Sequence, residues 1–167
     1  VNSFFSGLLN DYQAPKTNYK SSVLDQYQLQ LQKGNAYLRQ IPFSDLKAFE
    51  TIFSNLPDQI HLQLANSSTV RYAQLFDIPK GAEVFSNRGT SGIDGSTATA
   101  VGAALINQNP SLLITGDLSF FYDINGLWNN HIPSNFRVII INNQGGGIFR
   151  ILPGENDSPE YDTYFET

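Results

Sequence analysis

The order of apolar and polar residues predicts helices that alternate with short strands from about residue 43 onward. A helical pattern opens at Ser44, places Phe49 and Phe53 on one face, and is stopped by Pro57. Further helical patterns cover 67–76, 97–106 and 119–130, and the strand patterns cover 60–66, 83–86, 111–115 and 137–142. Strands that alternate with helices predict an α/β fold of three layers, with a mostly parallel sheet and helices on both faces.

For two of these segments the pattern also predicts which residues or faces are buried. The segment 119–130 is predicted as one helix whose inward-facing residues are Phe120, Ile124, Leu127 and Trp128. The segment 137–142 is continuously apolar, which is typical of a strand inside a parallel sheet that is covered on both faces.

Residues 1–42 have a different character, because they are rich in Gln, Asn and Tyr and only weakly periodic. The run 21–40 predicts a single helix with Leu24, Tyr27 and Leu31 along one face. We interpret residues 1–42 as a connecting arm from a preceding domain and residues 43–167 as the folded domain. The sequence has no Met, even at position 1, so we expect it to be part of a longer protein.

The amino-acid composition argues against several classes of function. Only 15% of the residues are charged, against about 25% in an average protein, and the net charge of −5 argues against nucleic acid or an anionic membrane as the main partner. The absence of Cys excludes a disulfide framework, a zinc finger and a Cys nucleophile. No apolar run approaches the roughly 20 residues that span a bilayer. The dinucleotide, P-loop and α/β-hydrolase motifs are also absent.

A pair of polar side chains follows two consecutive strands. Asp117 comes just after the strand at 111–115, Asn143 comes just after the strand at 137–142, and one helix lies between the strands. Such crossovers are parallel and right-handed, so both side chains reach the same edge of the sheet, where α/β proteins bind ligands. Carboxylate and amide oxygens suit Mg²⁺, which commonly also takes substrate phosphates as ligands. The pattern indicates a site for a metal-bridged diphosphate, although a helix cap at Asp117 and a simple turn at Asn143 remain open.

Three sequence blocks carry a family resemblance. The run GDLS, followed 26 residues after its Asp by the second Asn of INNQGGGIF, resembles the GDG…NN signature of thiamine-diphosphate enzymes. The blocks SNRGTSGIDGSTATAVGAA, GDLSFFYDINGLW and IINNQGGGIFRILPG are together similar to the diphosphate-binding domain of the SEPHCHC synthases, the MenD family. The resemblance covers about residues 43–154, and it implies that this domain is truncated at its C-terminus. Leu118 stands where most thiamine enzymes have Gly.

The resemblance implies roles for individual residues. The metal ligands would be Asp117 and Asn143 through their side chains and Gly145 through its carbonyl. The cofactor would be contacted by Gly116, Leu118, Ser119, Ile93, Gly145, Gly146, Ile148 and Phe149, with Ile93 as an apolar wedge beneath it. The substrate carboxylates would be bound by Arg71 and Arg88, and Ser67 would contact a substrate.

The same resemblance implies a transferase of menaquinone biosynthesis that uses thiamine diphosphate and Mg²⁺ or Mn²⁺. Such enzymes decarboxylate 2-oxoglutarate and add the succinic semialdehyde unit to isochorismate. The activating Glu would come from the pyrimidine-binding domain of a second subunit, so this chain would hold no catalytic residue and would be inactive alone. A cytoplasmic homo-oligomer is expected. The alternatives are another thiamine-dependent 2-oxoacid decarboxylase or carboligase, and a non-catalytic diphosphate-binding or interface module.

Overall fold

The computed structural model describes residues 2–13, 16–149 and 159–164. The chain divides into two compact units, Val1–Ile41 and Pro42–Thr167. In the first unit, helix α1 spans Asn2–Asp11 and helix α2 spans Tyr19–Leu38, which confirms the single helix expected over 21–40. No residue of α2 is buried, and Leu24 and Tyr27 are each 49% exposed. The role of this unit as a connecting arm stays a prediction.

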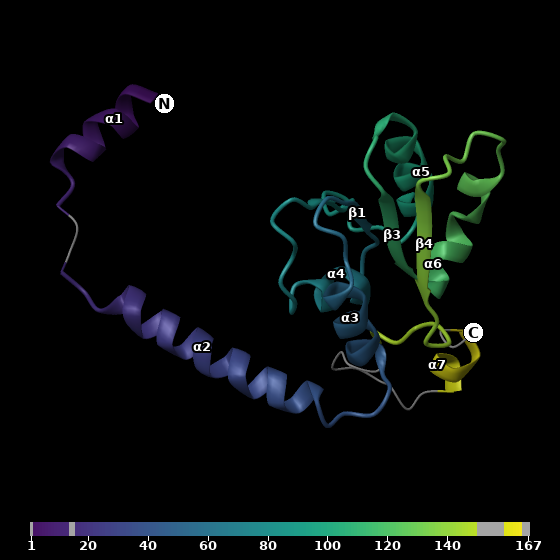
Figure 1. Cartoon of the computed structure of the whole chain (residues 1–167), viewed down its shortest axis with the longest axis horizontal. Helices are drawn as coiled ribbons and strands as arrows, with labels where there is room; N and C mark the ends of the chain where they lie inside the picture. The colour runs from purple at the N-terminus through teal and green to yellow at the C-terminus, as the bar shows by residue number, and fades with distance from the viewer. Residues whose placement is uncertain (1, 14–15, 150–158, 165–167) are drawn as a thin grey trace. The chain divides into compact units, whose positions relative to one another are not determined.

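The second unit is built on a sheet in which every strand pair is parallel (Figure 1). The strands are β1 (His61–Leu64), β2 (Glu83–Phe85), β3 (Ser111–Gly116) and β4 (Phe136–Ile141), in the spatial order β2-β1-β3-β4. The predicted α/β fold with a parallel sheet is therefore confirmed. Parallel pairing brings the carboxyl ends of β1, β3 and β4 to one edge, and this edge carries the site described below.

Helices cover both faces of this sheet. Helices α3 (Asp45–Ser54) and α4 (Ser68–Ala73) pack on one face, where Phe49 and Phe53 contact strand residues such as Leu62 and Ile114. Helix α5 (Ser96–Ile106) packs on the other face. Its buried residues Ala100, Val101 and Ala104 contact Leu113 and Phe136. Because successive strand residues face opposite sides, Leu113 and Ile114 belong to different layers of the core.

The single helix expected over 119–130 was wrong. Helix α6 spans only Asp117–Tyr122, and a 3₁₀-helix, η1, follows at Ile124–Leu127. The break lies at Asp123, which is 6% exposed and accepts a hydrogen bond from the Ala98 backbone N–H at 2.7 Å through Oδ2. This carboxylate caps the first turn of α5 and so ends α6. Trp128, expected in the core, is 90% exposed as a consequence.

Strand β4 also differs from its expectation. Within the described sheet it is an edge strand with β3 as its neighbour, and its Ile140 is 41% exposed. All four residues of β1 are buried, although the sequence alternates there, because β1 lies between β2 and β3. Helix α7 covers Pro159–Tyr164. Among the described residues, no helix is both long and apolar enough to cross a bilayer.

Candidate diphosphate and metal site

Strands β3 and β4 bring Asp117 and the loop after β4 together. Gly116 is paired with Ile141 in the register of the sheet, so Asp117 and Asn143 leave the same edge. Asp117 is 7% exposed. Its Oδ1 accepts from the Leu118 backbone N–H at 2.7 Å, and its Oδ2 accepts from the Gly145 N–H at 2.8 Å. The carboxylate is therefore held by both strand ends, as the crossover predicted.

The loop after β4 has an unusual backbone. Gln144, Gly145 and Gly146 have φ values of +67°, +73° and +55°, which is the left-handed region. Glycine adopts this region without steric cost, and Gln144 is supported by a bond from its N–H to the Asn142 Oδ1 at 3.2 Å. The Asn142 side chain thus stabilises the turn, whereas the Asn143 side chain faces the site. This course of the chain aims the Gly145 N–H at Asp117.

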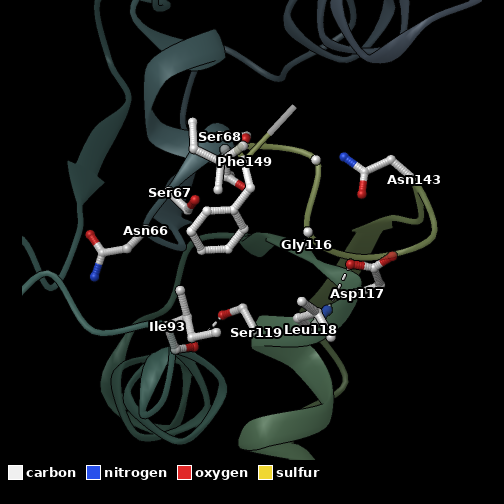
Figure 2. Close-up of a pocket in the computed structure, with 14 residues that line it drawn as sticks. Asn66, Ser67, Ser68, Ile93, Gly116, Asp117, Leu118, Ser119, Asn143 and Phe149 are labelled. Carbon is white, nitrogen blue, oxygen red and sulfur yellow. Dashed lines mark hydrogen bonds between the residues drawn. The ribbon is translucent and has the colours of Figure 1, made fainter. Parts of the chain in front are cut away.

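A pocket of about 150 Å³ opens at this edge (Figure 2). Its lining combines apolar side chains, hydroxyl groups and backbone from the ends of β1, β3 and β4. The lining residues are Asn66, Ser67, Ser68, Thr69, Ile93, Gly116, Asp117, Leu118, Ser119, Asn143, Gly146, Gly147, Ile148 and Phe149. Most of the cofactor and metal residues expected from the sequence are thus brought to one place. Gly145 is not in the lining and reaches the site through its bond to Asp117.

The loop before α5 is tied to α6 by one buried contact. The Ser119 hydroxyl donates to the Ile93 carbonyl, and Ser119 is 4% exposed. The bond fixes the backbone of Ile93, whose side chain lines the pocket on the side opposite Ser67 in Figure 2. Ile93 therefore has a fixed place in the pocket, and its role as an apolar wedge stays a prediction.

Asn66 is a site residue that the sequence analysis missed. It follows β1 and is 2% exposed, and its Nδ2 donates to the carbonyls of Asn87 and Gly92. Its Oδ1 accepts from Arg88 Nη1 at 3.3 Å. Ser67 is at the N-cap position of α4 and makes no side-chain cap bond, and the Asn66 side chain bonds to the 87–92 loop instead of the helix. Its place at the carboxyl end of a parallel strand is the signal that would have found it.

The expected substrate residues lie at different distances from the pocket. Ser67 lines it and has φ +66° and ψ −130°, a conformation that non-glycine residues rarely adopt. Arg88 is exposed and reaches the pocket wall through its hydrogen bond to Asn66. Arg71 is exposed in the last turn of α4. Neither arginine lines the pocket itself.

The polar groups at the edge fit a hard divalent cation. Two hydrogen bonds use part of the acceptor capacity of the Asp117 carboxylate, which has about four lone-pair sites in all. Asn143 adds an amide oxygen nearby, and oxygen ligands are those that Mg²⁺ prefers. Within the described part of the chain, no three His, Cys, Asp or Glu side chains gather to hold a metal on their own. A cation here therefore suits a ligand set that is completed by phosphate oxygens.

Comparison with known proteins decides the family. A family profile described as "Thiamine pyrophosphate enzyme, C-terminal TPP binding domain" matches residues 66–167. The chain belongs to this thiamine pyrophosphate enzyme family. The matched region begins just after β1 and contains β2, β3, β4 and every residue that lines the pocket, so thiamine diphosphate, the same compound as thiamine pyrophosphate, is the cofactor of this domain.

Individual relatives indicate which member of the thiamine pyrophosphate enzyme family the chain is similar to. The chain is 54% identical over 164 residues, 98% of its length, to a 2-succinyl-5-enolpyruvyl-6-hydroxy-3-cyclohexene-1-carboxylate synthase of Flavobacterium psychrophilum. It is 54% identical over 99% of its length to the synthase of Flavobacterium johnsoniae, and 60% identical over 78% to that of Christiangramia forsetii. The chain spans 30% of the length of each Flavobacterium relative and 23% of the third.

Proposed function

We propose that this chain is the diphosphate- and metal-binding part of a thiamine-diphosphate-dependent SEPHCHC synthase. The intact enzyme decarboxylates 2-oxoglutarate and transfers the succinic semialdehyde unit to isochorismate in menaquinone biosynthesis. The observation that carries the proposal is 54% identity to such a synthase over 98% of the chain. The joining of Asp117 to the loop after β4 supports it independently, because the edge then offers oxygen ligands.

In this proposal the sheet edge orients the cofactor. Asp117, Asn143 and the Gly145 carbonyl hold Mg²⁺ or Mn²⁺, while Gly116, Leu118, Ser119 and Gly146 approach the diphosphate. The bound cofactor supplies carbanion stabilisation, and the protein supplies binding and orientation. The metal neutralises phosphate charge that the acidic chain, with a net charge of −5, otherwise repels.

The apolar part of the pocket has a separate task. Ile93, Ile148 and Phe149 line it. Their side chains exclude water from the reacting carbons, and an environment with little water favours decarboxylation because the carboxylate charge disperses in the transition state. Arg71 and Arg88 bind the carboxylates of the two substrates, and Ser67 contacts a substrate. Arginine is suited to this task because its planar guanidinium donates two parallel hydrogen bonds to one carboxylate.

The proposal includes partners outside this chain. A pyrimidine-binding domain of a second subunit supplies the activating Glu, the enzyme is a homo-oligomer, and its location is cytoplasmic. The isolated chain of 167 residues is then inactive. Its relatives are about three times longer, since the chain spans 30% of them, which leaves room for such a domain.

The test uses the full-length synthase that carries this segment, assayed for CO₂ release and carboligation with thiamine diphosphate and Mg²⁺. We expect 2-oxoglutarate to be preferred over the monocarboxylate 2-oxobutyrate, and we expect no turnover by the isolated chain under the same conditions. Equal use of both 2-oxo acids would favour another 2-oxoacid decarboxylase. Turnover by the isolated chain would contradict the need for a second domain.

A further inference from the structure

The side chain of Asn143 is bound by a residue far away in the sequence. Its Nδ2 donates to Asp45 Oδ2 at 2.9 Å, across 98 positions. Asp45 is the first residue of α3, and Asn143 follows β4. Nothing in the local sequence pattern around Asp45 connects it to the strand ends.

We propose that Asp45 is a positioning residue that orients the Asn143 amide, so that Oδ1 and not Nδ2 is presented to the cation beside Asp117. The inference rests on the proposed function, in which Asn143 is a metal ligand. Figure 2 shows the two ends of the amide turned to different sides, with the oxygen on the side of Asp117 and the nitrogen away from it.

The orientation of the Asn143 amide follows from the hydrogen-bonding capacity of the Asp45 carboxylate. Ionised Asp45 accepts hydrogen bonds and donates none, whereas the Asn amide has a donor end and an acceptor end. Rotating the amide by half a turn would set Asn143 Oδ1 against Asp45 Oδ2 at the 2.9 Å that now separates donor and acceptor. Two acceptors at that distance repel each other, so Asp45 selects one of the two orientations. Loss of a residue that orients a metal ligand in this way typically lowers metal affinity by about 10- to 100-fold.

Asp45 is itself held in place by the fold. The Ser44 Oγ accepts from the Lys47 N–H at 3.4 Å and caps α3. Phe49, 1% exposed, anchors the same helix in the core and stacks on Tyr72. Burial raises the pKa of the Tyr72 hydroxyl, and the neighbouring Asp45 carboxylate raises it further. Asp45 therefore projects from a packed helix and not from a loose segment.

The Gly147 main chain also lies close to the Asn143 amide. A Cβ on Gly147 would lie 2.8 Å from Asn143 Nδ2 and 3.3 Å from its Cγ, so a larger residue there would displace the amide from its present position. The Asp45 carboxylate and the Gly147 main chain thus both border the nitrogen end of the Asn143 amide. This arrangement leaves its Oδ1 as the end directed to the site.

The test measures Mn²⁺ affinity by electron paramagnetic resonance in the full-length synthase with saturating thiamine diphosphate, without an activity assay. We expect Asp45→Ala to weaken Mn²⁺ binding by about 10- to 100-fold. Asp77→Ala is the matched control, because Asp77 is an exposed carboxylate of the same unit and its loss removes the same charge. Asp77→Ala should change the Mn²⁺ affinity by less than about twofold, since exposed charges are screened.

Two further variants separate orientation from a general structural effect. Asp45→Asn keeps an acceptor but adds a donor, so both amide orientations become possible and an affinity between those of Asp45→Ala and the parent is expected. If Asp45 acts through Asn143, the double variant Asp45→Ala/Asn143→Ala should bind Mn²⁺ no more weakly than Asn143→Ala alone. Should Asp45→Ala fail to fold, as judged by circular dichroism, Asp45→Asn carries the test and must still bind more weakly than the parent.

The outcomes distinguish this inference from the proposed function. If Asn143→Ala weakens Mn²⁺ binding and Asp45→Ala weakens it no more than Asp77→Ala does, the positioning role of Asp45 is overturned and the metal site stands. Additive losses in the double variant would also overturn it. If Asn143→Ala leaves the affinity unchanged, Asn143 is not a ligand, and both the metal-site assignment and this inference fail.

Discussion

The Asp117 carboxylate accepts a hydrogen bond from the Gly145 backbone N–H at 2.8 Å, across 28 positions of the chain. This contact joins the start of α6 to the loop after β4. It holds one oxygen of Asp117 in a fixed direction and aligns the loop whose residues 144–146 have positive φ. A rigid carboxylate at the edge of a parallel sheet is a suitable support for a cation and the phosphate groups it bridges.

Asn66 connects the end of β1 to the loop that carries Arg88. Asn66→Ala removes the acceptor for Arg88 Nη1 and the donor for two carbonyls. Hydrogen bonds to a charged group contribute about 1.5–3 kcal/mol each, so we expect kcat/KM for 2-oxoglutarate to fall by about tenfold or more in the full-length enzyme.

The control for Asn66 is Asn55→Ala. Asn55 is exposed and makes a comparable bond to the Thr51 carbonyl at 2.8 Å, away from the pocket. The Asn55→Ala substitution should leave kcat/KM unchanged. An Asn66→Ala enzyme with normal kcat/KM and only a lower unfolding temperature would limit Asn66 to a structural role.

Ser67 combines a strained backbone with a place in the pocket. Its φ of +66° and ψ of −130° cost about 1–3 kcal/mol for a non-glycine residue, against about 0.5–1 kcal/mol for the extra chain entropy of glycine. We therefore expect Ser67→Gly to raise the free energy of unfolding by about 0.5–2 kcal/mol, relative to Ser67→Ala, which keeps the strain. Thermal unfolding of the full-length protein without cofactor compares the two.

Both Ser67 variants lack the hydroxyl, so both should lose affinity for the 2-oxo acid to the same extent. An unchanged KM in both variants would show that the Ser67 hydroxyl does not bind the 2-oxo acid.

Gly126 allows η1 to approach the first turn of α5. A Cβ at this position would lie 2.9 Å from both the Ala98 N and the Ala98 Cα, which are backbone atoms that cannot move without displacing α5. Gly126→Ala should therefore destabilise the protein by about 1–3 kcal/mol. Gly102→Ala is the matched control, because Gly102 lies within α5 with no atom near its missing Cβ, and it should stabilise by about 0.5–1 kcal/mol. Opposite shifts in unfolding temperature are expected, and a neutral Gly126→Ala would show that η1 is not held against α5.

The sequence predicted those parts of the site that depend on local patterns. Asp117 and Asn143 were placed correctly at one edge because a crossover between neighbouring strands has a fixed direction and hand. Asp45 and the bonds of Asn66 were missed because their partners lie 98 and 21–26 positions away. Periodicity also failed at Asp123, where a bond to the Ala98 N–H ends α6 and leaves Trp128 exposed. A hydrophobic pattern contains no information about such a bond.

The central claim is that Asp117 holds a divalent cation that fixes the diphosphate. Calorimetric titration of thiamine diphosphate into the full-length synthase, with and without Mg²⁺, compares the parent with Asp117→Ala. We expect Mg²⁺-dependent binding in the parent and a loss of at least about 100-fold in Asp117→Ala, a larger effect than an outer positioning residue produces. Equal, Mg²⁺-dependent binding by the two proteins would contradict the account.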